Sequence, residues 1–305
     1  FQRVRDALNG DERGAIASMA DVQNAIKNGL GRNGFYGRST TNSSGGSPFW
    51  AAMYMSGIDS LGGSASGVYT NIPGGRAHDN TDTASMGYTI ANPRSGNKTF
   101  IHSVAITSLS ATATDIWNLA ILSDLLVACG GISPTAGGSQ TVNSTALTRY
   151  TTGVGVLACC DCVSPGLSTA TAQTATLTYT NQAGTGSRVS PGDASDGTSN
   201  MQVMPTGDRN TNEVLGPWFR LQAGDYGIRS VQSINIGTFT AGDGSPALNL
   251  FKPLVWLPGI EQNNVGYELD LTNNIYGLVE YAQDGSGVLG CLILYILMSG
   301  NPNST

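Results

Sequence analysis

The stretch TATLTYT constrains the fold of this chain most strongly, because apolar and polar residues alternate along it without a break. Ala175, Leu177 and Tyr179 fall on one side, and four threonines fall on the other. Successive side chains of a β-strand point to opposite faces of a sheet, so the pattern predicts a strand with one buried and one solvated face. The NQAGTG that follows is typical of a turn. The stretch therefore predicts antiparallel β-structure.

Further segments with the composition of strands occur along the chain, and most of them are separated by clusters of glycine, proline and asparagine. They are residues 98–108, 116–128, 154–163, 229–236, 247–257 and 287–297. Many strands joined by glycine-rich turns, without alternating helices, are typical of a sandwich or a barrel. The 41 glycines among 305 residues agree with such a turn-rich fold. We predict an all-β fold, a jelly-roll-like β-sandwich.

The N-terminal part of the chain differs from this body. It holds six of the 15 basic residues and the clearest helix signal, SMADVQNAIKNG, in which Ser18 can cap a helix while Val22 and Ile26 recur at helical spacing. The RSTTNSSGGS that follows has the composition of a flexible linker. We predict a short helical arm with its linker over residues 1–46 and a β-sandwich body over residues 47–305.

The charge of the chain argues against several classes of partner. Only 12% of the residues are charged and the net charge is −6. A protein that binds the phosphates of a nucleic acid needs a basic stripe, so we expect no nucleic-acid partner.

The longest apolar run, Val288 to Met298, is shorter than the about 20 residues of a membrane helix. We predict a core strand there and no membrane association. Charges interrupt the opening FQRVRDALNGDER, so we expect no secretory signal.

The sequence LACCDCV contains three of the five cysteines, Cys159, Cys160 and Cys162. On a strand, Cys160 and Cys162 share one face and Cys159 lies on the other, so at most two of them converge on one metal ion. A structural zinc site needs about four ligands, and no CxxC pair supplies them. We therefore predict buried strand cysteines without a metal, and a protein that assembles in a reducing cytosol.

The remaining candidates for chemistry are two histidines and several loop carboxylates. His102 lies in the strand pattern FIHSVAI, and His78 stands beside Asp79 without a G-x-S-x-G nucleophile elbow. Aspartate beside glycine is common turn chemistry, although two such carboxylates could form an acid–base pair for glycoside cleavage. These aspartates are Asp193, Asp196, Asp208, Asp225, Asp243 and Asp284. We predict no catalytic residue, no metal site and no cofactor, and thus not an enzyme.

Three stretches in a fixed order carry a resemblance to a known family. They are QTVNSTALTRYTTGVGV (140–156), ATLTYTNQAGTGSR (175–188) and LQAGDYGIRSVQSINI (221–236). They resemble motifs that recur in this order in virion proteins encoded by many tailed bacteriophages, and the match spans roughly residues 98–257. The chain departs from the family in its arm and in a loop from Ser190 to Pro217. The resemblance implies a non-enzymatic structural protein on the virion head, such as a capsid decoration (cement) protein or minor capsid protein, assembled in the host cytoplasm.

We expect the arm to provide attachment, because so short a helix gains its order from a partner. Arg3, Arg5, Val22 and Ile26 are the predicted contacts with the major capsid protein or other virion subunits. In the alternative interpretation the helix caps its own sandwich.

The apolar run from Val288 to Met298 is most easily buried between sheets or between subunits. By analogy with phage decoration proteins we expect a homo-oligomer, a trimer.

Two other classes of function stay open on the sequence alone. A tail or fibre receptor-binding protein that contacts host glycans should expose aromatic side chains at one end of the sandwich, with Trp50, Trp218 and Tyr226 as candidates. A glycan hydrolase should bring two loop carboxylates to face each other across a cleft.

Overall fold

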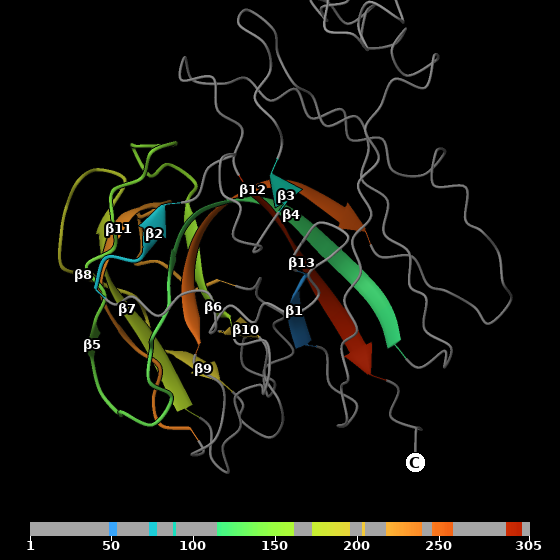
Figure 1. Cartoon of the computed structure of the whole chain (residues 1–305), viewed down its shortest axis with the longest axis horizontal. Helices are drawn as coiled ribbons and strands as arrows, with labels where there is room; N and C mark the ends of the chain where they lie inside the picture. Colours follow the sequence, from blue (N-terminus) through green and yellow to red (C-terminus); the bar gives the residue numbers. More distant parts are fainter. Residues whose placement is uncertain are drawn as a thin grey trace, which may run out of the picture.

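In the part of the chain that the computed structural model describes, all regular elements are β-strands (Figure 1). The described residues are 49–53, 73–77, 88–89, 115–161, 173–195, 203–204, 218–239, 246–258 and 291–300. The strands form two antiparallel sheets, which confirms the all-β prediction for this part of the chain. The predicted helix and the arm over residues 1–46 lie outside the described residues.

The larger sheet has eight strands and is built around the long strand β4. In spatial order its strands are β1 (Phe49–Met53), β13 (Cys291–Gly300), β4 (Asp115–Cys129), β12 (Ala247–Pro258), β6 (Leu157–Asp161) and β10 (Val203–Met204), with β2 (Arg76–Ala77) paired to β4 and β3 (Tyr88–Thr89) paired to β13. Residues 121–129 of β4 are all buried, so this strand is covered on both faces. The predicted strands at 116–128, 247–257 and 287–297 correspond to β4, β12 and β13.

The smaller sheet has five strands. Its order is β5 (Gln140–Thr141), β11 (Ile228–Asn235), β7 (Gln173–Asn181) and β8 (Arg188–Val189), with β9 (Asp193–Ser195) also paired to β7. Strand β7 confirms the predicted alternation, because Ala175, Leu177 and Tyr179 are fully buried while the threonines between them are not. The predicted strand at 98–108 lies outside the described residues.

One hydrophobic core holds the two sheets together. Leu126, Leu248 and Leu250 contribute to it from the larger sheet, and Leu177 and Val231 contribute from the smaller one; each is at most 1% exposed. Each fully buried leucine or valine side chain stabilises the fold by about 1.5–3 kcal/mol relative to an exposed position. In Figure 1 strands β5, β7, β8 and β11 lie to one side of β6 and β12, with β4 and β13 beyond them.

Strand β12 accommodates a proline in the middle of the larger sheet. Pro253 pairs with Ser123 of β4, and the register shifts just after it. On its other side β12 pairs with β6 only from Ala247 to Phe251, so Pro253 lies beyond the end of that ladder. Proline lacks the backbone N–H that a second ladder would require. The short length of β6 is therefore compatible with the proline in β12.

A buried ion pair ties the loop after β5 to the larger sheet. Arg149 Nη2 and Nε donate to the two carboxylate oxygens of Asp124 in β4, over 2.8 and 3.1 Å. Nη2 also donates to the Leu125 carbonyl over 3.1 Å. The two side chains are 5% and 0% exposed, so the pair is shielded from water. Such bidentate geometry fixes both the position and the orientation of the loop.

We predict that Arg149→Met lowers the free energy of unfolding by about 3–5 kcal/mol, because it leaves the Asp124 carboxylate buried without its cation. The double variant Asp124→Leu/Arg149→Met should recover much of this loss, since no unpaired charge remains. Urea unfolding followed by circular dichroism measures both, with Thr151→Ser at an exposed position as a control expected to stay within about 0.5 kcal/mol of wild type. An Arg149→Met variant as stable as wild type contradicts a stabilising role of this ion pair.

Candidate functional site

Three segments far apart in the sequence meet at one end of the smaller sheet. We call residues 149–156, 179–188 and 221–229 the loop cluster. Gly155 N donates to the Tyr226 carbonyl over 2.9 Å, Ile228 N to the Val156 carbonyl over 3.0 Å, and Gln182 N to the Gly227 carbonyl over 3.0 Å. The three segments belong to the three stretches that carry the resemblance, so those stretches form one structural unit.

Two glycines allow this close approach. Gly153 has φ +72°, and a Cβ there would come within 2.6 Å of the carbonyl group of Ile228. A Cβ on Gly227 would in turn meet the carbonyl group of Gly153. Glycine is required at both positions because a Cβ does not fit, and at Gly153 also because the backbone is left-handed. Tyr150 adopts a left-handed φ of 50° without being glycine, which places strain in the same loop.

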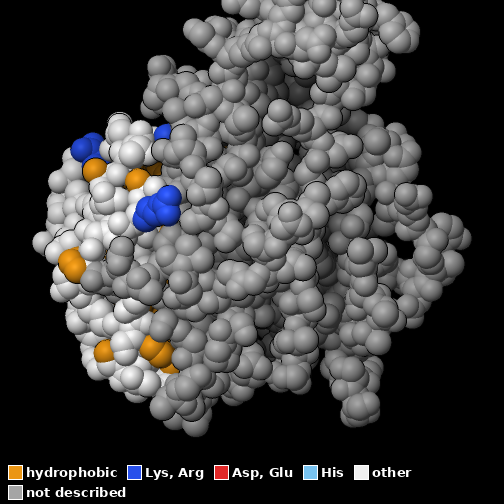
Figure 2. All heavy atoms as spheres, viewed as in Figure 1, with side chains coloured by type: hydrophobic (Ala, Val, Ile, Leu, Met, Phe, Trp, Pro, Cys, Tyr) orange, Lys and Arg blue, Asp and Glu red, His pale blue; other side chains and the backbone are white. Residues whose placement is uncertain are grey.

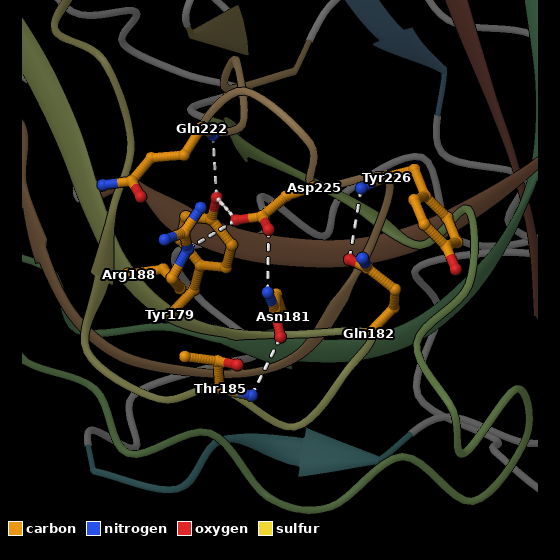
Figure 3. A network of polar contacts seen from close by, with 8 residues as sticks. All are labelled: Tyr179, Asn181, Gln182, Thr185, Arg188, Gln222, Asp225 and Tyr226. Atoms are coloured by element: carbon orange, nitrogen blue, oxygen red, sulfur yellow. Dashed lines mark hydrogen bonds and ion pairs between the residues drawn. The ribbon is translucent and has the colours of Figure 1, made fainter.

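Asp225 is the centre of the polar network in the loop cluster (Figure 3). Its Oδ2 accepts hydrogen bonds from Tyr179 Oη over 2.6 Å and from Arg188 Nε over 2.9 Å. Its Oδ1 accepts from Asn181 Nδ2 over 2.7 Å. The carboxylate side chain is 3% exposed. Both oxygens are thus engaged by donors from β7 and β8, and they hold the 221–226 loop against these strands.

The hydrogen bonds set the ionisation of this carboxylate and of its tyrosine partner. Burial alone would raise the pKa of Asp225, but the hydrogen bonds from Arg188, Tyr179 and Asn181 outweigh it and hold the pKa below its usual range. Burial and the hydrogen bond to Asp225 raise the pKa of Tyr179 to about 12. Near neutral pH the pair therefore exists as a carboxylate and a neutral phenol, which suits a structural hydrogen bond.

The turn after β7 is held by side-chain amides (Figure 3). Asn181 Oδ1 accepts from Thr185 N over 2.9 Å, which closes the turn on itself. Gln182 Oε1 accepts from Tyr226 N over 3.1 Å, which ties the turn to the neighbouring loop. Tyr179 Oη also accepts from Gln222 N over 2.9 Å. Backbone N–H groups of these loops thereby obtain partners without belonging to a sheet ladder.

Two cations donate hydrogen bonds to backbone carbonyls of the loop cluster. Arg229 Nε donates to the carbonyls of Thr152 and Gln182, over 3.1 and 3.0 Å. Lys252 Nζ donates to the Val154 carbonyl over 2.9 Å and lies 5.7 Å from the centre of the Tyr150 ring. Partial burial lowers the pKa of Lys252. These contacts bind both cations to neutral groups of the loops.

The outer surface of the loop cluster presents apolar side chains. Tyr226 is 61% exposed and Val154 is 44% exposed. Figure 3 shows the Tyr226 ring directed away from the Asp225 carboxylate. On the face in Figure 2, the coloured side chains of the described residues are hydrophobic or basic. The arrangement offers apolar and cationic groups to a partner.

Few of the site residues predicted from the sequence fall in the described part of the chain. Arg3, Arg5, Val22 and Ile26 lie outside it, as do His78 and His102. Among the candidate aromatics, Tyr226 is exposed, Trp218 is half-buried and Trp50 lies on β1. Of the loop aspartates, Asp225 forms the network and Asp193 begins β9; the others lie outside the described residues.

The cysteines of β6 lie in the predicted strand. Cys160 belongs to the core shared by the two sheets, whereas Cys159 is buried outside that cluster, and both are reduced. Cys129 on β4 is also buried, and burial raises the pKa of its thiol to about 12. Within the residues that the structure describes, no group of three or more His, Cys, Asp or Glu side chains is placed to hold a metal ion. Cys162 lies outside the described residues.

Comparison with known proteins adds no relative. The chain matches no protein-family model, no curated protein and no solved structure. In the described ranges no helix is long and apolar enough to cross a membrane.

We predict that Asp225 makes the stability of the body depend on pH in the acid range. Its folded pKa is lowered, so its contribution is complete above the unfolded value of about 4 and is lost as the pH falls through the folded value. The free energy of unfolding of the wild type should therefore decrease more between pH 6 and pH 3 than that of Asp225→Asn. Urea unfolding at a series of pH values measures this difference, and parallel pH curves for the two proteins would refute it.

Proposed function

We propose that the chain is a non-enzymatic structural protein of a bacteriophage virion, a capsid decoration (cement) or minor capsid protein with a jelly-roll-like sandwich body. One observation carries the proposal. The three stretches that resemble phage virion proteins join in a single loop cluster, in which Asp225 alone receives donors from Tyr179, Asn181 and Arg188. A motif whose polar residues bond to one another serves the architecture of the protein, and this supports a structural role.

The state of the described carboxylates also favours a structural protein over a hydrolase. Asp124 is engaged by Arg149, and Asp225 is engaged by Arg188. A general acid for glycoside cleavage needs a raised pKa and access to the substrate, whereas Asp225 has a lowered pKa and is 3% exposed. The described part of the chain thus gives no support to the hydrolase alternative.

In this proposal the arm, residues 1–46, attaches the body to the major capsid protein or to other virion subunits. Arg3, Arg5, Val22 and Ile26 supply the contacts. The body forms a homo-oligomer, a trimer, so that several arms bind one lattice and weak contacts add up through multivalency. The protein is located in the virion and assembles in the host cytoplasm.

A second function is favoured by one observation. Tyr226 is 61% exposed at the end of the smaller sheet, and an exposed aromatic ring is a stacking platform for a sugar. A tail or fibre protein that binds host glycans would use such a ring. Binding of glycans to the body, lost in Tyr226→Ala, would favour this second function over the first.

The test of attachment uses tailed particles stripped of this chain and then incubated with purified protein. We predict that a variant lacking residues 1–46 keeps a folded body but binds particles at least about tenfold more weakly than the full chain. The full-length variant Arg3→Glu/Arg5→Glu/Val22→Asp/Ile26→Asp tests the same contacts without changing the length of the chain. It should show the same loss of particle binding. Occupancy is measured by gel densitometry and folding by thermal unfolding.

Two outcomes would contradict this attachment. A truncated protein that decorates particles at wild-type occupancy shows that the arm is not needed. A truncated body that unfolds at a much lower temperature shows instead that the helix caps its own sandwich. A map of the intact particle by electron cryomicroscopy tests the wider proposal, since density for this chain must be found on the capsid.

A further inference from the structure

The outer surface of the loop cluster has the composition of a protein-binding site. We call Val154, Tyr226, Arg229 and Lys252 the cation–aromatic surface. The backbone connects its members: Gly155 N bonds to the Tyr226 carbonyl over 2.9 Å, and Lys252 Nζ bonds to the Val154 carbonyl over 2.9 Å. Tyrosine and arginine are enriched at the energetic centres of protein interfaces. Among the residues that the structure describes, Val154 and Tyr226 are exposed large hydrophobic side chains.

The cations of this surface differ from the other arginines that the loops use. Arg149 and Arg188 are paired with the carboxylates of Asp124 and Asp225. Arg229 and Lys252 instead donate to carbonyl oxygens, and these bonds fix the side chains without cancelling their charge. Cations held in place beside exposed apolar groups attract carboxylates that approach from another molecule.

The sequence supplies a partner of matching charge. The whole chain has 21 acidic and 15 basic residues. Residues 259–290 alone contain five acidic residues and no basic one, together with tyrosines and leucines. The sequence therefore contains an acidic stretch whose charge is opposite to that of Arg229 and Lys252.

We propose that the cation–aromatic surface binds an acidic stretch of a second copy of this chain. The charge complementarity lies within one sequence, so every copy carries both halves of the contact. Such a head-to-tail contact joins two different surfaces and generates a ring or a longer array. The contact is separate from the arm and requires no virion, so it stands whether or not the proposed function is correct.

Zero-length cross-linking tests the contact directly. Copies labelled with ¹⁵N are mixed with unlabelled copies, treated with a water-soluble carbodiimide, digested and analysed by mass spectrometry. The reagent joins the Lys252 amine to a carboxylate in contact with it, with loss of water. We expect peptides in which Lys252 of one isotope is linked to a carboxylate of the other isotope, with residues 259–290 as the leading acceptors.

Every other outcome of the cross-linking overturns the proposal. Links between Lys252 and carboxylates of the same isotope only show that the chain's own acidic residues occupy the surface. Absence of any link from Lys252 shows that no carboxylate binds there.

Sedimentation velocity provides the matched variants. Tyr226→Ser and Val154→Ser change exposed side chains and should weaken self-association at least about tenfold, as should raising the salt to about 0.5 M. Val189→Ser is the control, because Val189 is 47% exposed on the edge strand β8 and is not part of the surface. Wild-type protein that stays monomeric at about 100 μM, a concentration at which micromolar contacts are populated, overturns the proposal. Equal association of Tyr226→Ser and wild type does so as well.

Discussion

The carboxylate of Asp225 is the group on which the arrangement of the loops depends. It is almost completely buried, and a buried charge is tolerated only when hydrogen bonds replace the water that it has lost. Tyr179, Asn181 and Arg188 supply these bonds, and each lies on or beside strand β7. The requirement to satisfy one charge thus determines where the 221–226 loop meets the smaller sheet.

The ion pair of Arg149 with Asp124 performs the same task on the larger sheet. Together the two pairs hold the 149–156 loop between the sheets: Arg149 binds it to β4, and the hydrogen bond from Gly155 to the Tyr226 carbonyl joins it to the loop that Asp225 secures. Replacing such pairs by apolar residues is often neutral for stability, because the desolvation of both charges opposes their attraction. We infer that these pairs serve mainly to fix one arrangement of the loops.

Sequence periodicity predicted the strands whose burial alternates and was less accurate where backbone irregularities interrupt the period. The alternation in β7 is confirmed residue by residue, and β4, β12 and β13 lie close to their predicted ranges. In β11, by contrast, Ile228, Val231 and Ile234 are buried at every third position, because register shifts after Ile228 and Val231 turn the following residues over. Strands of two or three residues, such as β5 and β8, are too short to show any period.

The segment predicted as a strand over 154–163 shows the same limit. Its first residues form part of the loop cluster, because Gly153 and Gly155 adopt left-handed φ values of 72° and 66°, and β6 begins only at Leu157. The sequence marked Asp225 as a turn aspartate. Its partner Tyr179 lies 46 residues away, on the strand face that was predicted to be buried. Local pattern contains no information on which distant donor meets which carboxylate, so the network was not foreseen.

The network also prepares the outer surface for binding. The backbone of Tyr226 is held on both sides, since its N–H donates to Gln182 Oε1 and its carbonyl accepts from Gly155 N. Its ring therefore projects from a fixed backbone. A partner that binds this ring orders only the side chain and no loop, and each ordered side chain costs about 0.5–1.5 kcal/mol. The buried polar contacts of Asp225 and the exposed ring of Tyr226 are thus two consequences of one loop conformation, the first stabilising it and the second presenting it to solvent.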